Sequence, residues 1–153
     1  MPRVPPVSDL SAHLGFRLRM VSNHVSHAFA TKLADKGVTV AEWSVMRTLY
    51  GKDPMPPSRL ADAMGMTRGA ISKLAERLIV KTLIVREANA DDGRAQTLGL
   101  TERGTALVPE LAALADRNDA EFFDCLTGDE RETLERLLNR LAERGHMTAL
   151  PLA

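Results

Sequence analysis

Residues that could contact a polyanion, admit its close approach or orient a side chain that contacts it are concentrated between residues 58 and 94 of this chain. The group comprises Ser58, Thr67, Arg68, Gly69, Ser72, Lys73, Arg77, Asp92 and Arg94. Hydroxyl, guanidinium and ammonium groups donate hydrogen bonds to base edges and phosphate oxygens when a helix presents them to a DNA groove. A solvated helix face without function is the alternative interpretation of the same residues.

The net charge of the chain argues at first against a nucleic-acid partner. The 153 residues include 20 Lys and Arg and 20 Asp and Glu, whereas DNA-binding domains are usually basic. The charges are unevenly placed, however. Residues 1–103 hold 15 basic and 10 acidic side chains, a net of +5, and residues 104–153 hold 5 and 10, a net of −5. The sequence therefore describes a basic body followed by an acidic C-terminal segment.

The pattern of apolar residues and turn signals predicts a helix-turn-helix around this group. A short helix is expected from Ser58 to Met64, followed by a turn at Gly65 and a second helix over residues 68–81 with Thr67 as its N-cap. The side chains expected to face inward on the second helix are Ala70, Ile71, Leu74 and Leu78. That orientation leaves Thr67, Arg68, Gly69, Ser72 and Lys73 outward near the helix start, where Arg68 can fork onto guanine. We expect Arg77, one turn later, to pair with Glu76 or Asp62 or to touch phosphate.

A β-hairpin is predicted directly after the second helix. Residues 83–86 and 96–100 have strand patterns, and a polar segment between them forms the tip. Helix-turn-helix plus hairpin is a winged helix. At the tip, Arg94 can enter a narrow minor groove, and Asp92 can hold its side chain by a bidentate pair. A surface ion pair that stabilises only the hairpin is the alternative.

Long helices are predicted on both sides of this centre. The first runs from Ser8, as its N-cap, to about Ala34, and Gly37 is suited to a left-handed cap at its end. Thr39 and Glu42 then form a capping box that opens a second helix. Near the C-terminus, one helix runs from Thr101 to about Leu126, and another follows a capping box at Thr127. The apolar stripes of these outer helices favour a two-fold dimer, although folding back onto one chain is the alternative.

The resulting fold class is mainly α with a small β-hairpin wing. We expect residues 1–153 to form a single unit. Within it, residues 39–100 are the winged helix-turn-helix DNA-binding domain, and residues 8–36 with 101–145 are dimerisation helices.

These features resemble the MarR family of bacterial transcriptional regulators. The resemblance is carried by Ser58-Arg59-Leu60-Ala61, by residues 67–78, by Arg86, by Asp92-Gly93-Arg94 and by Leu98-Gly99-Leu100-Thr101-Glu102-Arg103-Gly104. It implies an intertwined homodimer that binds a pseudo-palindromic operator in double-stranded DNA, usually as a repressor relieved by a small ligand or an oxidant. The ligand class implied is a small aromatic or phenolic effector.

The resemblance also places an effector crevice between the first two helices, the fifth helix and the winged domain. Residues predicted to line it are Arg17, Asn23, His24 and Trp43. One departure from the family concerns the residue after the recognition helix, which is often glycine and here is Thr82. Because β-branched residues are disfavoured at positive φ, we expect a different turn there.

Other classes of function lack support in the sequence. The nucleophile–base pairs, phosphate-binding glycine loops and metal-ligand clusters of enzymes are not recognisable, so we expect no enzyme, no metal and no cofactor. His24 and His27 lack further ligands, and Cys125 is interpreted as a buried small apolar side chain. The chain has neither a membrane-spanning apolar run nor a secretory signal, which predicts a cytoplasmic protein without membrane contact. A winged-helix module for protein contacts alone is the alternative function.

Overall fold

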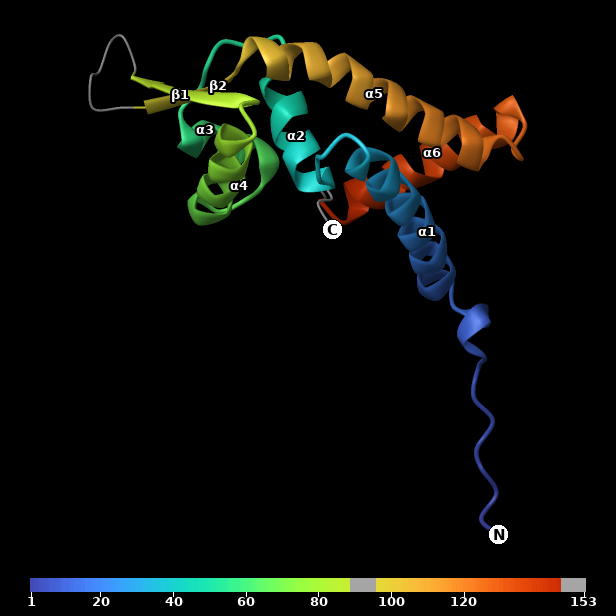
Figure 1. Ribbon diagram of the computed structural model, residues 1–153. Helices are drawn as coiled ribbons and strands as arrows, with labels where there is room; N and C mark the ends of the chain where they lie inside the picture. The colour runs from blue at the N-terminus through green and yellow to red at the C-terminus, as the bar shows by residue number, and fades with distance from the viewer. Residues whose placement is uncertain (89–95, 147–153) are drawn as a thin grey trace.

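A computed structural model describes residues 1–88 and 96–146, in which helices and one hairpin form an elongated arrangement (Figure 1). Within these ranges the elements are η1 (Leu10–Ala12), α1 (Leu14–Ala34), α2 (Val40–Leu49), α3 (Pro57–Met64), α4 (Arg68–Val80), β1 (Ile84–Ala88), β2 (Gln96–Leu100), α5 (Glu102–Phe123) and α6 (Gly128–Arg144). The predicted fold class of helices with a small hairpin is confirmed. No helix in the described ranges is both long and apolar enough to cross a bilayer.

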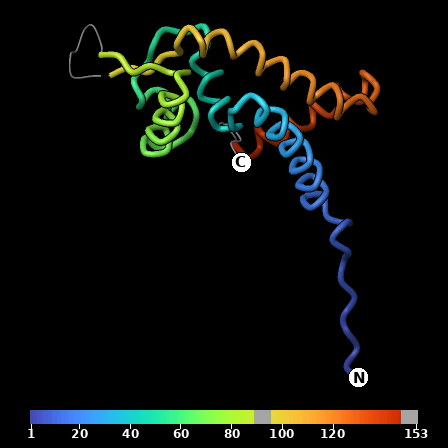
Figure 2. The backbone as a smooth tube through the Cα atoms, viewed as in Figure 1, coloured from blue at the N-terminus to red at the C-terminus, as the bar shows by residue number. Residues whose placement is uncertain are grey.

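The N-terminal segment differs from the prediction. Helix α1 begins at Leu14, and Asp9 rather than Ser8 precedes the short η1 turn, without a capping hydrogen bond. Residues 1–13 are all exposed and lead away from the helices (Figure 2). A helical extension there has no surface to pack against, and isolated helical turns are unstable in water, so the predicted cap at Ser8 is wrong.

The capping signals elsewhere position the elements as expected. Thr39 and Thr127 both form complete capping boxes, with Glu42 and Glu130 as their respective partners. Gly37 ends the turn after α1 at a φ of 72°, a left-handed conformation in which glycine carries no steric penalty. These signals are local hydrogen bonds and backbone preferences, which explains why the sequence predicts them well.

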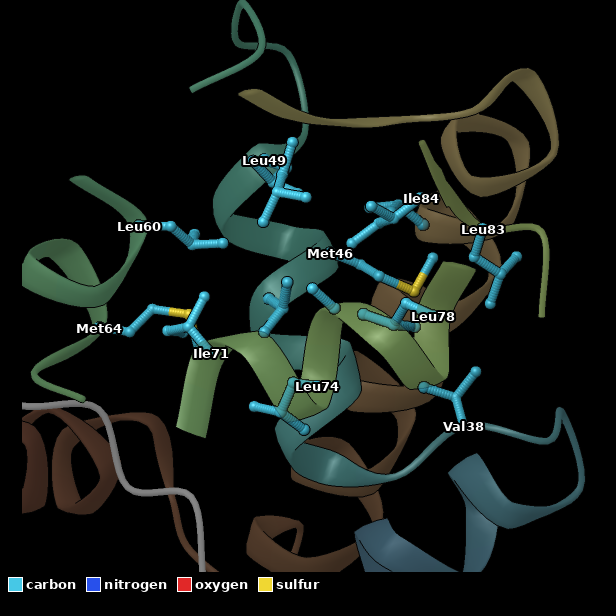
Figure 3. Close-up of a cluster of buried hydrophobic side chains, with 14 of the residues drawn as sticks. Val38, Met46, Leu49, Leu60, Met64, Ile71, Leu74, Leu78, Leu83 and Ile84 are labelled. Atoms are coloured by element: carbon cyan, nitrogen blue, oxygen red, sulfur yellow. The ribbon is translucent and has the colours of Figure 1, made fainter. Parts of the chain in front are cut away.

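The core lies where α2 packs against α3, α4 and the hairpin (Figure 3). Met46 of α2, Leu78 of α4 and Ile84 of β1 meet there, and all three are almost completely buried. The loop before α3 extends the hairpin, because Met55 exchanges two backbone hydrogen bonds with Leu98 of β2, at 3.0 and 2.8 Å. Helix α4 and the hairpin thus form one packed unit on α2.

The outer helices leave an apolar groove uncovered. Helix α6 buries none of its residues, and its Leu141 is 54% exposed; on α1, Leu14 is 83% exposed. Side chains of α1, the end of α5 and α6 line a groove of about 670 Å³ there. Cys125 lies in this groove and is exposed, so its predicted burial is wrong for the single chain. It lies in the turn between α5 and α6, and in the single chain neither helix covers it.

Candidate nucleic-acid interface

The start of α4 is built by two adjacent local signals. Gly65 takes a φ of 63° and ends α3, and the Thr67 hydroxyl accepts a hydrogen bond of 3.1 Å from the Ala70 N–H to begin α4. A left-handed glycine followed two residues later by a threonine N-cap gives the tight turn of a helix-turn-helix. This turn fixes the direction in which the first residues of α4 point.

Helix α4 buries one face and exposes the other. Ile71, Leu74 and Leu78 point into the core, whereas the predicted contact residues on this helix are exposed (Figure 3). The exposed set is Thr67, Arg68, Gly69, Ser72, Lys73 and Arg77. No atom approaches within 4 Å of the position that a Cβ of Gly69 would occupy. The first two turns of α4 therefore present donors and a bare stretch of backbone to solvent.

Two of the predicted residues lie at the edges of this surface. Ser58 is half-buried in the first turn of α3. The carboxylate of Glu76 pairs with Arg86 of β1 at 2.8 Å, rather than with its neighbour Arg77. This ion pair ties the hairpin to α4, and Arg77 is exposed one turn beyond Lys73.

The hairpin is held in register beside α4. Its antiparallel pairs run from Ile84 with Leu100 to Ala88 with Gln96. Gly99 lies against Pro54, whose Cγ is 3.0 Å from the site of a Cβ, so a larger residue there crowds the α2–α3 loop. Asp92 and Arg94, the predicted tip residues, lie outside the described residues.

The end of α4 is anchored by a buried ion pair that the sequence did not reveal. The Lys81 ammonium donates to both carboxylate oxygens of Glu42, at 2.9 and 2.8 Å, and to the Gly37 carbonyl at 2.8 Å. Glu42 is fully buried, and its carboxylate also accepts from the Thr39 N–H. Burial alone raises the pKa of the Glu42 carboxyl, but the hydrogen bonds from Lys81 and Thr39 outweigh it and hold that pKa below its usual value.

This ion pair joins the end of α4 to the junction between α1 and α2. The sequence identified Glu42 as half of a capping box, which is a local signal. Nothing local indicates its second partner, because Lys81 is 39 residues away. The contact makes the orientation of α4 depend on that junction.

The expectation that Thr82 avoids a positive φ is wrong. Thr82 takes a φ of 61°, the left-handed conformation that the sequence argued against. Its carbonyl accepts from the Thr101 hydroxyl at 2.7 Å, and its hydroxyl accepts from the Arg103 guanidinium at 2.9 Å. These contacts from the start of α5 hold the residue in a conformation that is otherwise unfavourable.

The predicted effector residues are not brought together. A cleft of about 350 Å³ opens between α1, α2 and α5, and of the four predicted residues Trp43 lines it. His24 instead stacks near Phe122, with ring centroids 5.6 Å apart, and the Arg17 guanidinium donates to the Ser11 carbonyl. Asn23 is exposed on α1.

The cleft contains polar residues that the sequence did not single out. Asp116, Asn118 and Asp119 of α5 contribute to its wall. In the sequence, Asp116 and Asp119 look like an ordinary solvated helix face, so nothing near them indicates that they line a cleft.

Comparisons with known proteins agree with this geometry. The sequence profile of the MarR family matches residues 36–95. A protein of Thauera aromatica assigned as a transcriptional regulatory protein for the hcr operon is 32% identical over 134 residues, which span 87% of this chain and 81% of that protein.

Two solved structures are similar along most of their length. A crystal structure from Pseudomonas aeruginosa, assigned as a transcriptional regulator, has a TM-score of 0.75 and 32% identity, and the match covers 87% of this chain and 99% of that one. A mutant of MarR from E. coli in complex with operator DNA has a TM-score of 0.74 and 26% identity, with coverage of 84% and 92%.

Proposed function

Because this chain belongs to the MarR family of DNA-binding transcriptional regulators, we propose that it acts as a homodimeric repressor that a small-molecule effector releases from a pseudo-palindromic operator. The observation that carries the proposal is the exposed row of donors at the start of α4, beside bare backbone at Gly69. We further propose that it works in the cytoplasm, where the operator DNA of a bacterium lies.

The start of α4 enters the major groove in this proposal. Arg68 reads guanine through a bidentate hydrogen bond, and Thr67 and Ser72 bond bases or phosphates. Lys73, Arg77 and Ser58 contact phosphate. The backbone at Gly69 approaches the DNA closely because no side chain intervenes.

The hairpin tip contributes a minor-groove contact. Arg94 inserts into the narrow groove, whose negative potential attracts a guanidinium, and Asp92 orients it. Support for this role comes from the sequence of the tip and from the strands β1 and β2, which lead towards it beside α4.

The apolar groove is covered by a second copy of the chain. The exposed leucines of α1 and α6 come from opposite ends of the sequence and line one groove. Large contiguous apolar patches on soluble proteins mark interfaces. We therefore assign residues 8–36 and 101–145 to dimerisation and residues 39–100 to DNA binding. Two recognition helices about 34 Å apart then enter successive major grooves.

The dimer is tested by substitutions on two faces of α6. Leu138→Glu places a charge in the groove, and we expect it to shift the protein to monomer by light scattering. Asn139→Glu is the matched control, because Asn139 is exposed and does not line the groove. A Leu138→Glu protein that remains dimeric contradicts this interface.

DNA binding is tested by mobility shift on the DNA upstream of the chain's own gene. Arg94→Ala should weaken binding to all sequences, whereas Arg68→Ala should also relax base preference. Wild-type binding by Arg94→Ala excludes the role of the hairpin tip. A wild-type protein without affinity for any duplex excludes the whole proposal and favours a winged helix used for protein contacts.

A further inference from the structure

The cleft between α1, α2 and α5 has an aromatic wall. Phe29 of α1 and Trp43 of α2 meet edge to face, with ring centroids 6.5 Å apart and an interplanar angle of 83°. Both rings line the cleft and are half-buried, so apolar ring surface remains available to a ligand. Figure 1 shows the three helices approaching one another at this point, between the winged centre and the far end of α5.

The opposite wall carries two carboxylates. Asp116 and Asp119 lie three residues apart on α5, so they share one helix face, and both residues line the cleft. Within residues 1–88 and 96–146, neither carboxylate takes part in a recorded ion pair. Both residues are exposed at the rim of the cleft, and their combined negative charge has no ion-pair partner within those ranges.

One ammonium group reaches the wall of the cleft, but two other side chains hold it. The Lys32 ammonium lies 3.1 Å from Glu121 and donates to the buried Asn118 side chain at 3.0 Å. Asn118 in turn donates to the Val25 carbonyl at 3.2 Å, so its amide is also occupied. Among the described residues that line the cleft, none is Lys, Arg or His.

We propose that this cleft binds an organic cation with an aromatic or apolar body, in place of a phenolate or carboxylate. The cation lies between the two carboxylates and the face of Trp43, where Coulombic and cation–π attraction add. An anion of the same size meets two negative charges, and the ammonium at the cleft wall, that of Lys32, is already held by Glu121 and Asn118. The inference rests on the proposed function, because it names the chemical class of the effector.

The position of the cleft also connects this cation to DNA binding. Trp43 directly follows Glu42 in α2, and Glu42 holds the end of the recognition helix through Lys81. A ligand that displaces Trp43 therefore acts on the segment that orients α4. Release from DNA follows if the bound cation favours an orientation of α4 that fits the operator less well.

The test uses the fact that Trp43 is the single tryptophan of the chain. Its fluorescence is titrated in the full-length protein with benzyltrimethylammonium and, at equal ionic strength, with phenylacetate. We expect saturable quenching by the cation and at least about tenfold weaker binding of the anion, the scale of one moderately screened charge pair. Tighter binding of phenylacetate, or no saturable response to the cation, overturns the proposal.

Three variants test whether the carboxylates are responsible. Asp116→Asn and Asp119→Asn should each weaken cation binding, and the double variant should weaken it by about tenfold or more. Asp124→Asn is the matched control, since Asp124 is an exposed carboxylate at the end of the same helix that does not line the cleft. Unchanged cation affinity in the double variant overturns the proposal.

The same variants distinguish a wrong ligand class from a wrong assignment of the protein as a DNA-binding regulator. Each variant is also titrated with upstream DNA in the absence of the cation. Loss of cation binding with intact DNA binding supports the assignment of the ligand class. Failure of the wild-type protein to bind the cation, with intact DNA binding, rejects the ligand class alone, whereas absence of DNA binding rejects the regulator.

Discussion

The Lys81 ammonium contacts both carboxylate oxygens of Glu42, and Glu42 is fully buried. The contact joins the C-terminal end of α4 to the first turn of α2. Removing one partner of a buried ion pair is far more destabilising than the pair is stabilising, because the remaining charge stays buried. The pair therefore makes the position of α4 sensitive to small changes at either residue.

Lys81→Met should lower the free energy of unfolding by about 2 kcal/mol. The value lies below the 3–5 kcal/mol typical of buried pairs because the Lys81 side chain is 37% exposed. Urea unfolding measures the change. Lys73→Met, which alters an exposed lysine on the same helix, should change stability by less than about 0.5 kcal/mol. Equal stabilities for the two variants contradict a structural role for the ion pair.

Glu42 also predicts a pH dependence of stability. Its pKa in the folded chain lies below the ordinary value of 4.5, so the unfolded chain takes up the proton first as pH falls. The stabilisation from this group is fully present above pH 4.5 and is lost as pH falls through the lower folded pKa. Glu42→Gln should therefore show a shallower loss of stability across this range in urea unfolding at stepped pH. An unchanged slope excludes Glu42 as a contributor.

Two substitutions of Thr82 measure the backbone strain in the turn after α4. Thr82→Val keeps the β-branched shape but loses the hydroxyl contact with Arg103, whereas Thr82→Gly removes the strain of the positive φ. We expect the glycine variant to be more stable than the valine variant by about 1 kcal/mol, since left-handed conformations disfavour a Cβ by roughly that amount. Thermal unfolding compares them. A valine variant as stable as the glycine variant indicates that the turn carries no strain.

Gly69 separates folding from DNA binding. Because no atom lies within 4 Å of a Cβ placed there, Gly69→Ala should raise stability by about 0.5 kcal/mol through helix propensity. The added methyl group holds the backbone away from DNA, and we expect about tenfold weaker operator binding, the size of one lost contact. Gly128→Ala is the matched control, since its Cβ site is also open and lies far along the chain on α6. Full operator affinity in Gly69→Ala excludes close approach at this position.

The local features of this fold were predictable, and the long-range ones were not. The capping threonines, the left-handed Gly37 and the inward face of α4 follow from hydrogen-bonding and apolar patterns within a few residues. The contact between Lys81 and Glu42 joins segments 39 residues apart, and no short pattern encodes it.

The sequence predicts the burial of a side chain poorly where that burial depends on a second copy of the chain or on elements distant in sequence. Cys125 was expected inside because it is a small apolar side chain, but it lies in the groove that one copy of the chain leaves open. Ser8 has the sequence signature of a helix start, but in the single chain the residues before Leu14 have nothing to pack against. Thr82 shows the converse, because tertiary hydrogen bonds impose a conformation that residue type alone disfavours.

A chain with equal numbers of acidic and basic residues can bind DNA only if its basic side chains gather on one face, and the salt dependence of binding measures how many of them contact phosphate. Affinity for the upstream DNA is measured by fluorescence anisotropy across a series of salt concentrations. Each phosphate contact contributes a slope of about −0.9 to the plot of log affinity against log salt, so several contacts per dimer predict a steep slope. Lys73→Ala should make it shallower by about 2, one contact in each subunit. Salt-insensitive binding, or a slope that Lys73→Ala leaves unchanged, contradicts DNA binding through phosphate contacts on this face of α4.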